Sequence, residues 1–491
     1  MRSRLFFCFC FCLTALALQS DALSLGRKTF RLSGDPSAGL SGNAVIDIVV
    51  RGQDVWVGAG EGLSRTGDFG RTWSTYTREN GFGKGGLSAV QVRGQEIWVA
   101  TAYDTLIKDQ GSLPAGGGLA YSTDGGVSWT FVPQPKDARD VTAYKPTTTH
   151  INNLTYDIAL TDSAVWIASF AGGLRRSTNH GAAWEIVTVD GAPFDVVGHL
   201  SHRMFSVLSD GETLWAGSAG GVHKSTDGGN SWTTFTHQNQ LKPISGNFVV
   251  AIACQNWQGR KIVWAATIEA LDEGESRAVS ISEDGGLTWD VVLEGELAHN
   301  FTFRDGDVYV ATDNGMFKSP DLGMTWTAFR NVVDSETGDP LLTTEMYSVG
   351  AGPGNWTWLG SSDGLAATPD EGLTWRIFRA FEIPGESGNP QTYAYPNPFS
   401  YTRDNLLGGD GHVRFQYRIG SPAEVTVQVY DFSMALVRNV VQDKPRPVPG
   451  DYAEAWDGRN DLGEPVANGV YFYRLRLSGG GEYWGKVIIL N

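Results

Sequence analysis

Hydrophobic and polar residues alternate in short runs along most of the chain. Runs such as AVIDIVV from Ala44 and LSAVQV from Leu87 are each followed by a tight polar turn and a second apolar run with an aromatic residue near its start, as in DVWVGAG and EIWVATA. Alternation with a period of two, interrupted by clusters of Gly, Asp and Ser, predicts β-strands joined by tight turns. The pattern therefore predicts an all-β protein.

One short motif, called the turn motif below, recurs seven times after a predicted third strand. The copies are TGDFGRTW from Thr66, STDGGVSW from Ser122, STNHGAAW from Ser177, STDGGNSW from Ser225, SEDGGLTW from Ser282, SPDLGMTW from Ser319 and TPDEGLTW from Thr368. Their tryptophans are spaced roughly forty to fifty-five residues apart, which is the period of a β-propeller blade. With four strands for each copy, the repeat predicts a seven-bladed β-propeller.

The turn motif has to reverse the chain between the third and fourth strands of a blade. An Asp or Asn side chain can accept hydrogen bonds from the N–H groups of its own turn, and the glycine that follows supplies a positive φ. The Ser or Thr can do similar local work, and the Trp ring can cover the hairpin. We therefore predict a structural role for the acidic or amide residue of each copy, namely Asp68, Asp124, Asn179, Asp227, Asp284, Asp321 and Asp370.

The turn motif resembles the Asp-box, or bacterial neuraminidase repeat, of the sialidase-like and photosystem II stability factor-like propellers. Two blades depart from the pattern: Asn179 and Ala183 replace the acid and the hydroxyl residue of the third copy, and Ala278 replaces a glycine in blade five. In that family the Asp-box is a fold element. The Arg-Ile-Pro of sialidases is absent, since FEIP at Phe381 has no arginine and follows the last blade. Resemblance to the photosystem II stability propellers also leaves open an assembly factor with a protein partner.

The last hundred residues have a different pattern. Four stretches, YPNPF at Tyr395, VYD at Val429, WDGRNDLGEPVANGVYFYRL at Trp456 and GKVIILN at the end, resemble the FlgD-type Ig-like fold and the type A C-terminal sorting domain of type IX secretion substrates. The resemblance implies a small Ig-like β-sandwich that directs the protein through the outer-membrane secretion and sorting machinery. We expect a signal peptide at 1–22, the propeller at 23–380, a linker at 381–394 and the sorting domain at 395–491.

The first residues predict export. A basic start, an apolar run and a small-residue site ending at Ala22 are typical of a secretory signal peptide. Three of the four cysteines lie in this segment, which leaves Cys254 without a disulfide partner. We expect Cys254 to be a small buried side chain. We expect no transmembrane segment after signal removal, and a secreted or outer-surface location.

Charge narrows the range of partners. The formal net charge is −16, with 38 basic and 54 acidic residues spread along the chain. Such a surface repels phosphate backbones, so we expect neither nucleic acid nor an anionic membrane as a partner.

The longest predicted connections all fall on one face of the propeller, called the long-loop face below. They are the insertions 101–117 and 269–277 and the crossovers 133–151, 190–204 and 331–344. Variable loops on a rigid scaffold usually carry binding. The candidate ligand residues there are Tyr103, Lys136, Arg139, Tyr144, His150, His199, His202 and Arg203. His199 and His202 form an H-x-x-H pair, but the sequence offers no partner cluster, so we predict no metal site.

No motif predicts catalytic residues or a cofactor. We therefore favour an exported, non-catalytic propeller that binds a glycan or a protein on the long-loop face. The alternative is a secreted glycoside hydrolase or lyase that uses the same face, which would need two carboxylates roughly 5 to 10 Å apart. We also expect residues Lys28 to Leu32 to pair with blade seven and help close the ring.

Overall fold

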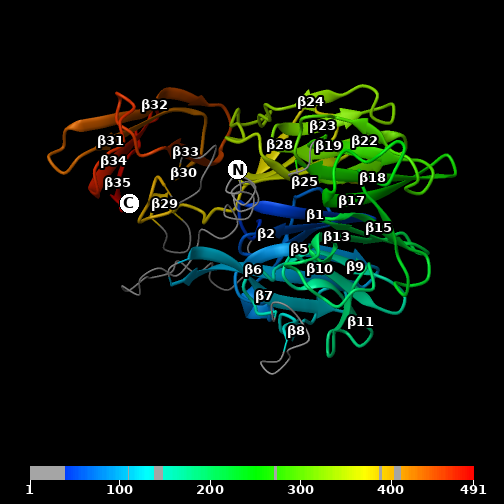
Figure 1. The fold of residues 1–491 in the computed structure, drawn as a ribbon. Helices are drawn as coiled ribbons and strands as arrows, with labels where there is room; N and C mark the ends of the chain where they lie inside the picture. Colours follow the sequence, from blue (N-terminus) through cyan, green and yellow to red (C-terminus); the bar gives the residue numbers. More distant parts are fainter. Residues whose placement is uncertain (1–38, 109, 138–147, 270–273, 386–389, 403–410) are drawn as a thin grey trace. The chain divides into compact units, whose positions relative to one another are not determined.

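The computed structural model describes residues 39–491 except 109, 138–147, 270–273, 386–389 and 403–410 (Figure 1). The expected signal peptide and the expected ring-closing segment at Lys28 lie outside the described residues. The described chain forms two compact units. One contains the chain up to Val332 and Thr344–Phe378, and the other contains Val333–Thr343 and Arg379–Asn491.

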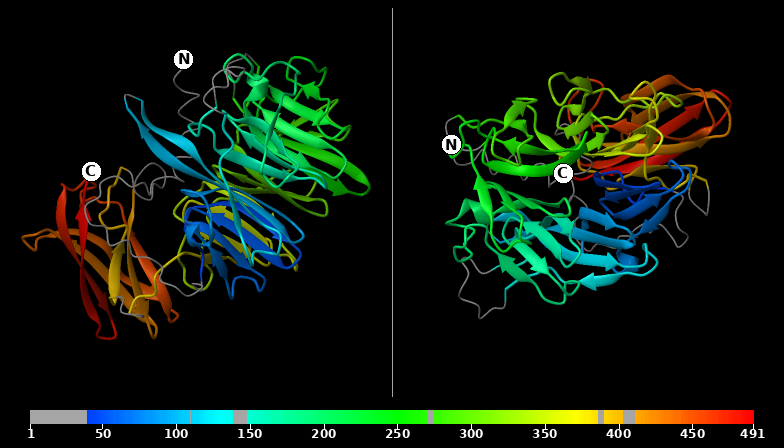
Figure 2. Two further views of the ribbon diagram at one scale, coloured as in Figure 1. Left: turned by 90° about the horizontal axis from the view of Figure 1, so that it is seen from below. Right: turned by 90° about the vertical axis from the view of Figure 1, so that its right-hand side faces the viewer.

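The first unit is a propeller. In the described residues it contains seven four-stranded antiparallel sheets, each built from one continuous stretch of chain (Figures 1 and 2). The innermost strands contact one another in sequence order, and β1 of the first blade also contacts β25 of the seventh. The ring is therefore closed, and the prediction of seven blades is confirmed.

Every blade has the same strand order. The innermost strands are β1 (Val45–Arg51), β5 (Gly86–Arg93), β9 (Thr155–Leu160), β13 (Met204–Ser209), β17 (Phe248–Trp257), β21 (Ala298–Arg304) and β25 (Met346–Ala351). The second strands are β2 (Asp54–Ala59), β6 (Glu96–Ile107), β10 (Val165–Ser169), β14 (Leu214–Ser218), β18 (Arg260–Ile268), β22 (Asp307–Thr312) and β26 (Thr357–Ser361).

The third strands are β3 (Gly62–Thr66), β7 (Gly111–Ser122), β11 (Gly173–Ser177), β15 (Gly221–Ser225), β19 (Ala278–Ser282), β23 (Gly315–Ser319) and β27 (Gly364–Thr368). The outer strands are β4 (Ser74–Tyr76), β8 (Thr130–Val132), β12 (Glu185–Val187), β16 (Thr233–Phe235), β20 (Asp290–Val292), β24 (Thr327–Phe329) and β28 (Arg376–Phe378). Two short 3-10 helices, η1 (Arg78–Asn80) and η2 (Leu200–His202), lie in crossovers. Within the described residues, no helix is long and apolar enough to span a membrane.

A β-bulge lies near the start of all seven innermost strands. The pairing shifts by one residue between Val45 and Asp47 in β1, and at the corresponding place in the other six strands. A bulge leaves one residue out of the ladder and redirects its side chain. The bulged residues are Ile46, Ser88, Tyr156, Phe205, Val250, His299 and Tyr347, so four of the seven are aromatic or histidine.

Apolar side chains from the facing sheets seal the blades against one another. Between blades one and two, for example, Trp56 and Leu63 pack with Val90 and Val99, and all four are buried. Burial of such large surfaces is the main favourable term in folding. The aromatic residue near the start of the predicted second strands is the largest of these buried side chains in several blades, as at Trp98, Trp166 and Trp264.

The second unit is an Ig-like β-sandwich. One sheet contains β29 (Thr392–Tyr395), β30 (Val413–Ile419) and β33 (Gly450–Trp456). The other has the order β32 (Leu436–Arg446), β31 (Ala423–Tyr430), β34 (Gly469–Leu477) and β35 (Glu482–Ile489). The alternation in β31 places Val425, Val427 and Val429 in the core, where none of the three is exposed. The predicted fold class, a propeller followed by a small sandwich, is confirmed.

Candidate functional site

The turn motif forms the same hydrogen-bonded turn between the third and fourth strands of each blade. In the fourth copy the Ser225 hydroxyl donates to Oδ1 of Asp227 (2.8 Å) and accepts the N–H of Gly229 (2.8 Å). Oδ1 also accepts the N–H of Ser231 (2.9 Å), while Oδ2 accepts its hydroxyl (2.6 Å). Gly229 has a φ of 86°, which a residue with a Cβ adopts at a cost.

The carboxylates of these turns are held in the charged form. Hydrogen bonds from the hydroxyl and N–H of Ser231 lower the pKa of Asp227 to about 2, and the equivalent bonds lower the pKa of Asp68 and Asp124 to about 2. Three further motif acids shift in the same direction: Asp284, Asp321 and Asp370. Asn179 keeps only the hydrogen bonds that Oδ1 accepts in the other copies, from the Ser177 hydroxyl (3.0 Å) and from the N–H of Ala183 (2.9 Å). The hydrogen bonds that Asp227 accepts all come from residues of its own turn.

Four aromatic side chains gather at the other end of the blades. Tyr156, Phe205 and Phe248 lie at or near the starts of the consecutive innermost strands β9, β13 and β17, and Phe170 directly follows β10. The ring centroid of Phe205 is 5.4 Å from that of Tyr156, 6.0 Å from that of Phe170 and 4.7 Å from that of Phe248. Phe205 is buried and the other three are half-buried. We call these four residues the aromatic cluster.

Arg203 extends the aromatic cluster with a positive charge. Its guanidinium lies 5.8 Å from the centre of the Phe170 ring. Its Nε donates to the carbonyl of Val196 (2.6 Å), and Nη2 donates to that of Val197 (3.1 Å). The crossover that precedes β13 therefore holds this arginine in place beside the aromatic rings. Both bulged residues of the cluster, Tyr156 and Phe205, lie where crossovers enter innermost strands, which is the long-loop face.

Asp190 bonds to both histidines of the H-x-x-H pair, a contact that the sequence did not reveal. Its Oδ2 lies 3.0 Å from Nδ1 of His199 and accepts the Ser201 hydroxyl (2.9 Å), and its Oδ1 lies 2.9 Å from Nε2 of His202. Burial works to raise the pKa of Asp190, but the hydrogen bonds from His202, the N–H of Ala192 and Ser201 together hold it well below its usual range.

The hydrogen bonds of His202 argue against a metal ion in this group, although the three candidate ligand atoms lie within 4.8 Å of one another. Nδ1 of His202 accepts the N–H of Asp195 (2.9 Å). A neutral imidazole carries one ring proton, so that proton must be on Nε2, the atom that faces Asp190. A protonated ring nitrogen has no free lone pair for a metal. The group is therefore a hydrogen-bond network that shapes the crossover next to the aromatic cluster.

The structure separates the predicted ligand residues into groups. His199 and His202 stack with centroids 4.7 Å apart, and Arg203 directly follows them. Tyr103 instead stacks with His150 (6.4 Å) and lies under the Lys84 ammonium (3.9 Å). Lys136 is exposed. Arg139 and Tyr144 lie outside the described residues. Tyr103 belongs to a long hairpin, since β6 and β7 extend well beyond the other strands of their sheet (Figure 2).

Two carboxylates lie on innermost strands with raised pKa values. Burial raises the pKa of Asp47 to about 7, with a further contribution from the charge of Asp157, and burial raises the pKa of Asp157 to about 6. Asp47 accepts the N–H of Val90 in the next blade (2.8 Å), and Asp157 accepts that of Val207 in the next blade (2.9 Å). Each acid therefore accepts a backbone N–H from the innermost strand of the next blade.

Serines do the same work elsewhere in the ring. The Ser348 hydroxyl accepts the N–H of Ile48 (2.9 Å), and that of Ser206 accepts the N–H of Ile252 (3.1 Å).

Cys254, on β17, is half-buried, and burial raises the pKa of its thiol to about 12. The thiol is therefore protonated at neutral pH and a poor nucleophile.

Comparison with known proteins supports the two-part fold. Residues 403–481 match the FlgD Ig-like domain family. A GH74 enzyme from Niastella koreensis is 17% identical with a TM-score of 0.53, covering 93% of this chain and 74% of that one. At this identity the similarity shows the fold alone. No curated protein matches the sequence.

Two other solved structures are similar at lower TM-scores. YCF48 from Cyanidioschyzon merolae is 17% identical with a TM-score of 0.43, covering 70% of this chain and 97% of that one. PorZ, a surface component of the type IX secretion system of Porphyromonas gingivalis, is 13% identical with a TM-score of 0.39, covering 90% of this chain and 64% of that one.

Proposed function

We propose that this chain is an exported, non-catalytic protein whose propeller binds a glycan or a protein on the long-loop face. The aromatic cluster beside Arg203 carries the proposal. Half-buried aromatic rings offer a flat apolar surface for a sugar face or an apolar side chain, and a fixed guanidinium adds hydrogen-bond donors for hydroxyl, carbonyl or carboxylate groups. The rings sit on three adjacent blades, so the surface is held by the rigid part of the fold.

The C-terminal unit supports the second half of the proposal. The match of residues 403–481 to the FlgD Ig-like family agrees with the resemblance of the chain end to type IX sorting domains. In this proposal the signal peptide expected at residues 1–22 directs the chain across the inner membrane. The sandwich then directs it to the outer-membrane secretion and sorting machinery. The propeller is the part that functions outside the cell, and its turn motifs are Asp-boxes with a scaffold role.

The surroundings of the buried acids favour binding over catalysis. The pKa values of Asp47 and Asp157 rise toward neutrality, which is what a general acid requires. Each accepts a backbone N–H at the edge of the next blade, a task that serine performs in other blades. We therefore assign both acids to the fold, and we expect no hydrolysis.

A polysaccharide and protein panel tests the proposal. The chain from residue 23 is presented to the panel, and retention and released sugar are recorded together. We expect retention without products. In the Phe170→Ala, Phe248→Ala double variant we expect retention to fall at least about tenfold, because the stacking surface is lost.

The matched control is Phe131→Ala, which removes an exposed phenylalanine from the outer strand β8 and should bind like the parent. Sugar release would contradict the non-catalytic proposal. Equal binding by the double variant and the control would contradict the proposed surface.

A further inference from the structure

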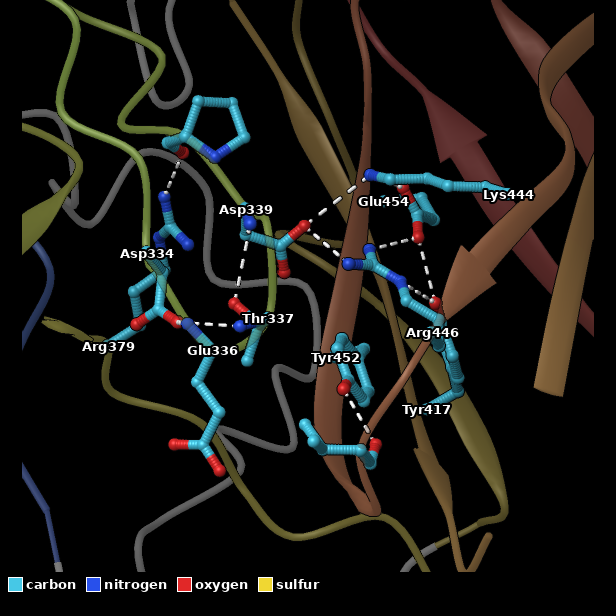
Figure 3. A network of polar contacts seen from close by, with 12 residues as sticks. Asp334, Glu336, Thr337, Asp339, Arg379, Tyr417, Lys444, Arg446, Tyr452 and Glu454 are labelled. Atoms are coloured by element: carbon cyan, nitrogen blue, oxygen red, sulfur yellow. Dashed lines mark hydrogen bonds and ion pairs between the residues drawn. The ribbon is translucent and has the colours of Figure 1, made fainter. Parts of the chain in front are cut away.

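Segment Val333–Thr343 lies between β24 and β25 in the sequence, yet it belongs to the C-terminal unit. Within the described residues, the chain therefore passes between the two units after Val332, after Thr343 and after Phe378. A sandwich at the end of a chain normally needs only one connection. The additional passage brings a short acidic segment to the sandwich, and Figure 3 shows its contacts there.

The segment is a compact turn that fixes the position of Asp339. Oδ1 of Asp334 accepts the N–H groups of Glu336 (3.0 Å) and Thr337 (2.8 Å), and the carbonyl of Asp334 accepts the N–H of Gly338 (2.9 Å). The N–H of Asp334 donates to the carbonyl of Asp339 (2.8 Å), which closes the turn. A carboxylate held in place before it binds loses less entropy on binding.

The sandwich meets this carboxylate with two cations. Nη1 of Arg446 donates to Oδ1 of Asp339 (2.6 Å), and Nζ of Lys444 lies 3.4 Å from the same atom (Figure 3). The Arg446 side chain is fully buried, and the side chain of Asp339 is only 14% exposed. Arg446 also bonds to Glu454 and donates through Nε to the Tyr417 hydroxyl (2.9 Å).

Asp339 balances the charge of this site. Arg446 and Lys444 carry two positive charges, and Glu454, which bonds to both, supplies one negative charge. Without Asp339, one cation at a largely buried position lacks a counter-charge, which is costly away from water. In this structure the inserted segment supplies the second negative charge of the group, through Asp339.

We propose that Arg446 and Lys444 form a carboxylate-binding site that keeps the C-terminal sandwich attached to segment Val333–Thr343 after the linker that precedes the sandwich is cut. Because Val332 and Thr344 continue into the propeller chain, a sandwich bound to this segment stays with the rest of the protein. A single proteolytic cut then does not release it, and release also requires loss of the Asp339 contact. This inference is independent of what the propeller binds.

The test introduces a protease recognition sequence between Ser387 and Gly388 of the full chain. The protein is cut to completion, as judged on a denaturing gel, and is then passed over a sizing column at physiological salt. We expect the two fragments to elute together. In Asp339→Asn we expect them to separate, with a dissociation constant raised at least about 30-fold, because a buried cation loses its ion pair.

Glu336→Gln is the matched control. It removes the same charge from the same segment, but Figure 3 shows the Glu336 carboxylate pointing away from Arg446. This variant should co-elute like the parent, and the melting of uncut protein should show that both variants are folded. Separation of the parent fragments would overturn the proposal. So would co-elution of the Asp339→Asn fragments at parental affinity, or equal weakening by Glu336→Gln.

Discussion

At the scale of single residues, the turn motif divides its work between two side-chain atoms. Oδ1 of the acid accepts backbone N–H groups and the first hydroxyl, and Oδ2 accepts the second hydroxyl. Blade three shows that the first part is enough for the turn, since Asn179 has a single acceptor oxygen and its turn still forms. The charge is therefore not needed for the turn to form.

Two substitutions at Asp227 separate these contributions. Asp227→Asn keeps an acceptor at Oδ1, so we expect a small decrease in Tm. Asp227→Ala leaves the N–H of Ser231 and the hydroxyl of Ser225 without their partner, so we expect a decrease several times larger. Thermal melting followed by circular dichroism measures both. Equal decreases would show that charge, and not the backbone acceptor, holds the turn.

The buried acids of the innermost strands, Asp47 and Asp157, make the folded state less stable as the pH rises. The lowered pKa values of the turn-motif acids, such as Asp227, act in the opposite direction. The pKa of Asp47 is about 7 in the folded chain and about 3.9 in an unfolded one. Between those values the folded state binds more protons, so this contribution to stability is present at low pH and declines as the pH rises toward 7. Asp157, with a pKa of about 6, acts in the same direction.

The Asp47→Asn variant tests this sign. The Tm of the variant minus the Tm of the parent should be larger at pH 8 than at pH 5, because the amide has no charge to bury at either pH. Asp162→Asn serves as the control, since that carboxylate is fully exposed and should give the same difference at both pH values. A larger benefit at pH 5 for Asp47→Asn would show that the folded state holds Asp47 charged.

At the scale of elements, the crossovers shape the candidate site. The connection from β12 to β13 contains Asp190, His199, His202 and Arg203, and its internal hydrogen bonds place Arg203 beside Phe170. Because Nε2 of His202 carries a proton in this arrangement, we expect added Zn²⁺ to leave the Tm unchanged. A Zn²⁺-dependent increase in Tm that disappears in His202→Ala would contradict the tautomer and establish a metal site.

Sequence patterns predicted the regular elements well and the site only in part. Alternation and the repeated turn motif predicted seven four-stranded blades, because both depend on neighbours close in sequence. Asp190 was missed as the partner of His199 and His202 because its role depends on how a crossover folds back. Phe170, Phe205 and Phe248 come from different strands, so only closure of the ring brings them together.

The insertion at 101–117 illustrates the same limit. The sequence predicted a long loop, and the structure shows that it lengthens β6 and β7 into a hairpin, with Tyr103 paired to Ala115. Asp339 is the more distant case, since it is more than 100 positions from Arg446 and no local pattern connects them. Long-range ion pairs of this kind follow from tertiary packing alone.

At the scale of the whole molecule, ring closure depends on contacts between the first and last blades. Each blade is one continuous stretch, so no described strand is shared between chain ends. Contact of β1 with β25 and the bond from Ile48 to Ser348 close the ring instead. A scaffold closed in this way leaves one end of the blades to the uniform turn motifs and the other to variable connections.

Hydrogen–deuterium exchange with and without a bound ligand locates the binding surface of the propeller. The ligand is the strongest binder from the panel, and exchange is compared with and without it. We expect protection confined to the aromatic cluster and its crossovers, chiefly residues 167–172 and 190–206, with the seven turn motifs unchanged. Protection centred on the turn motifs, with residues 190–206 exchanging as in the free protein, would contradict it.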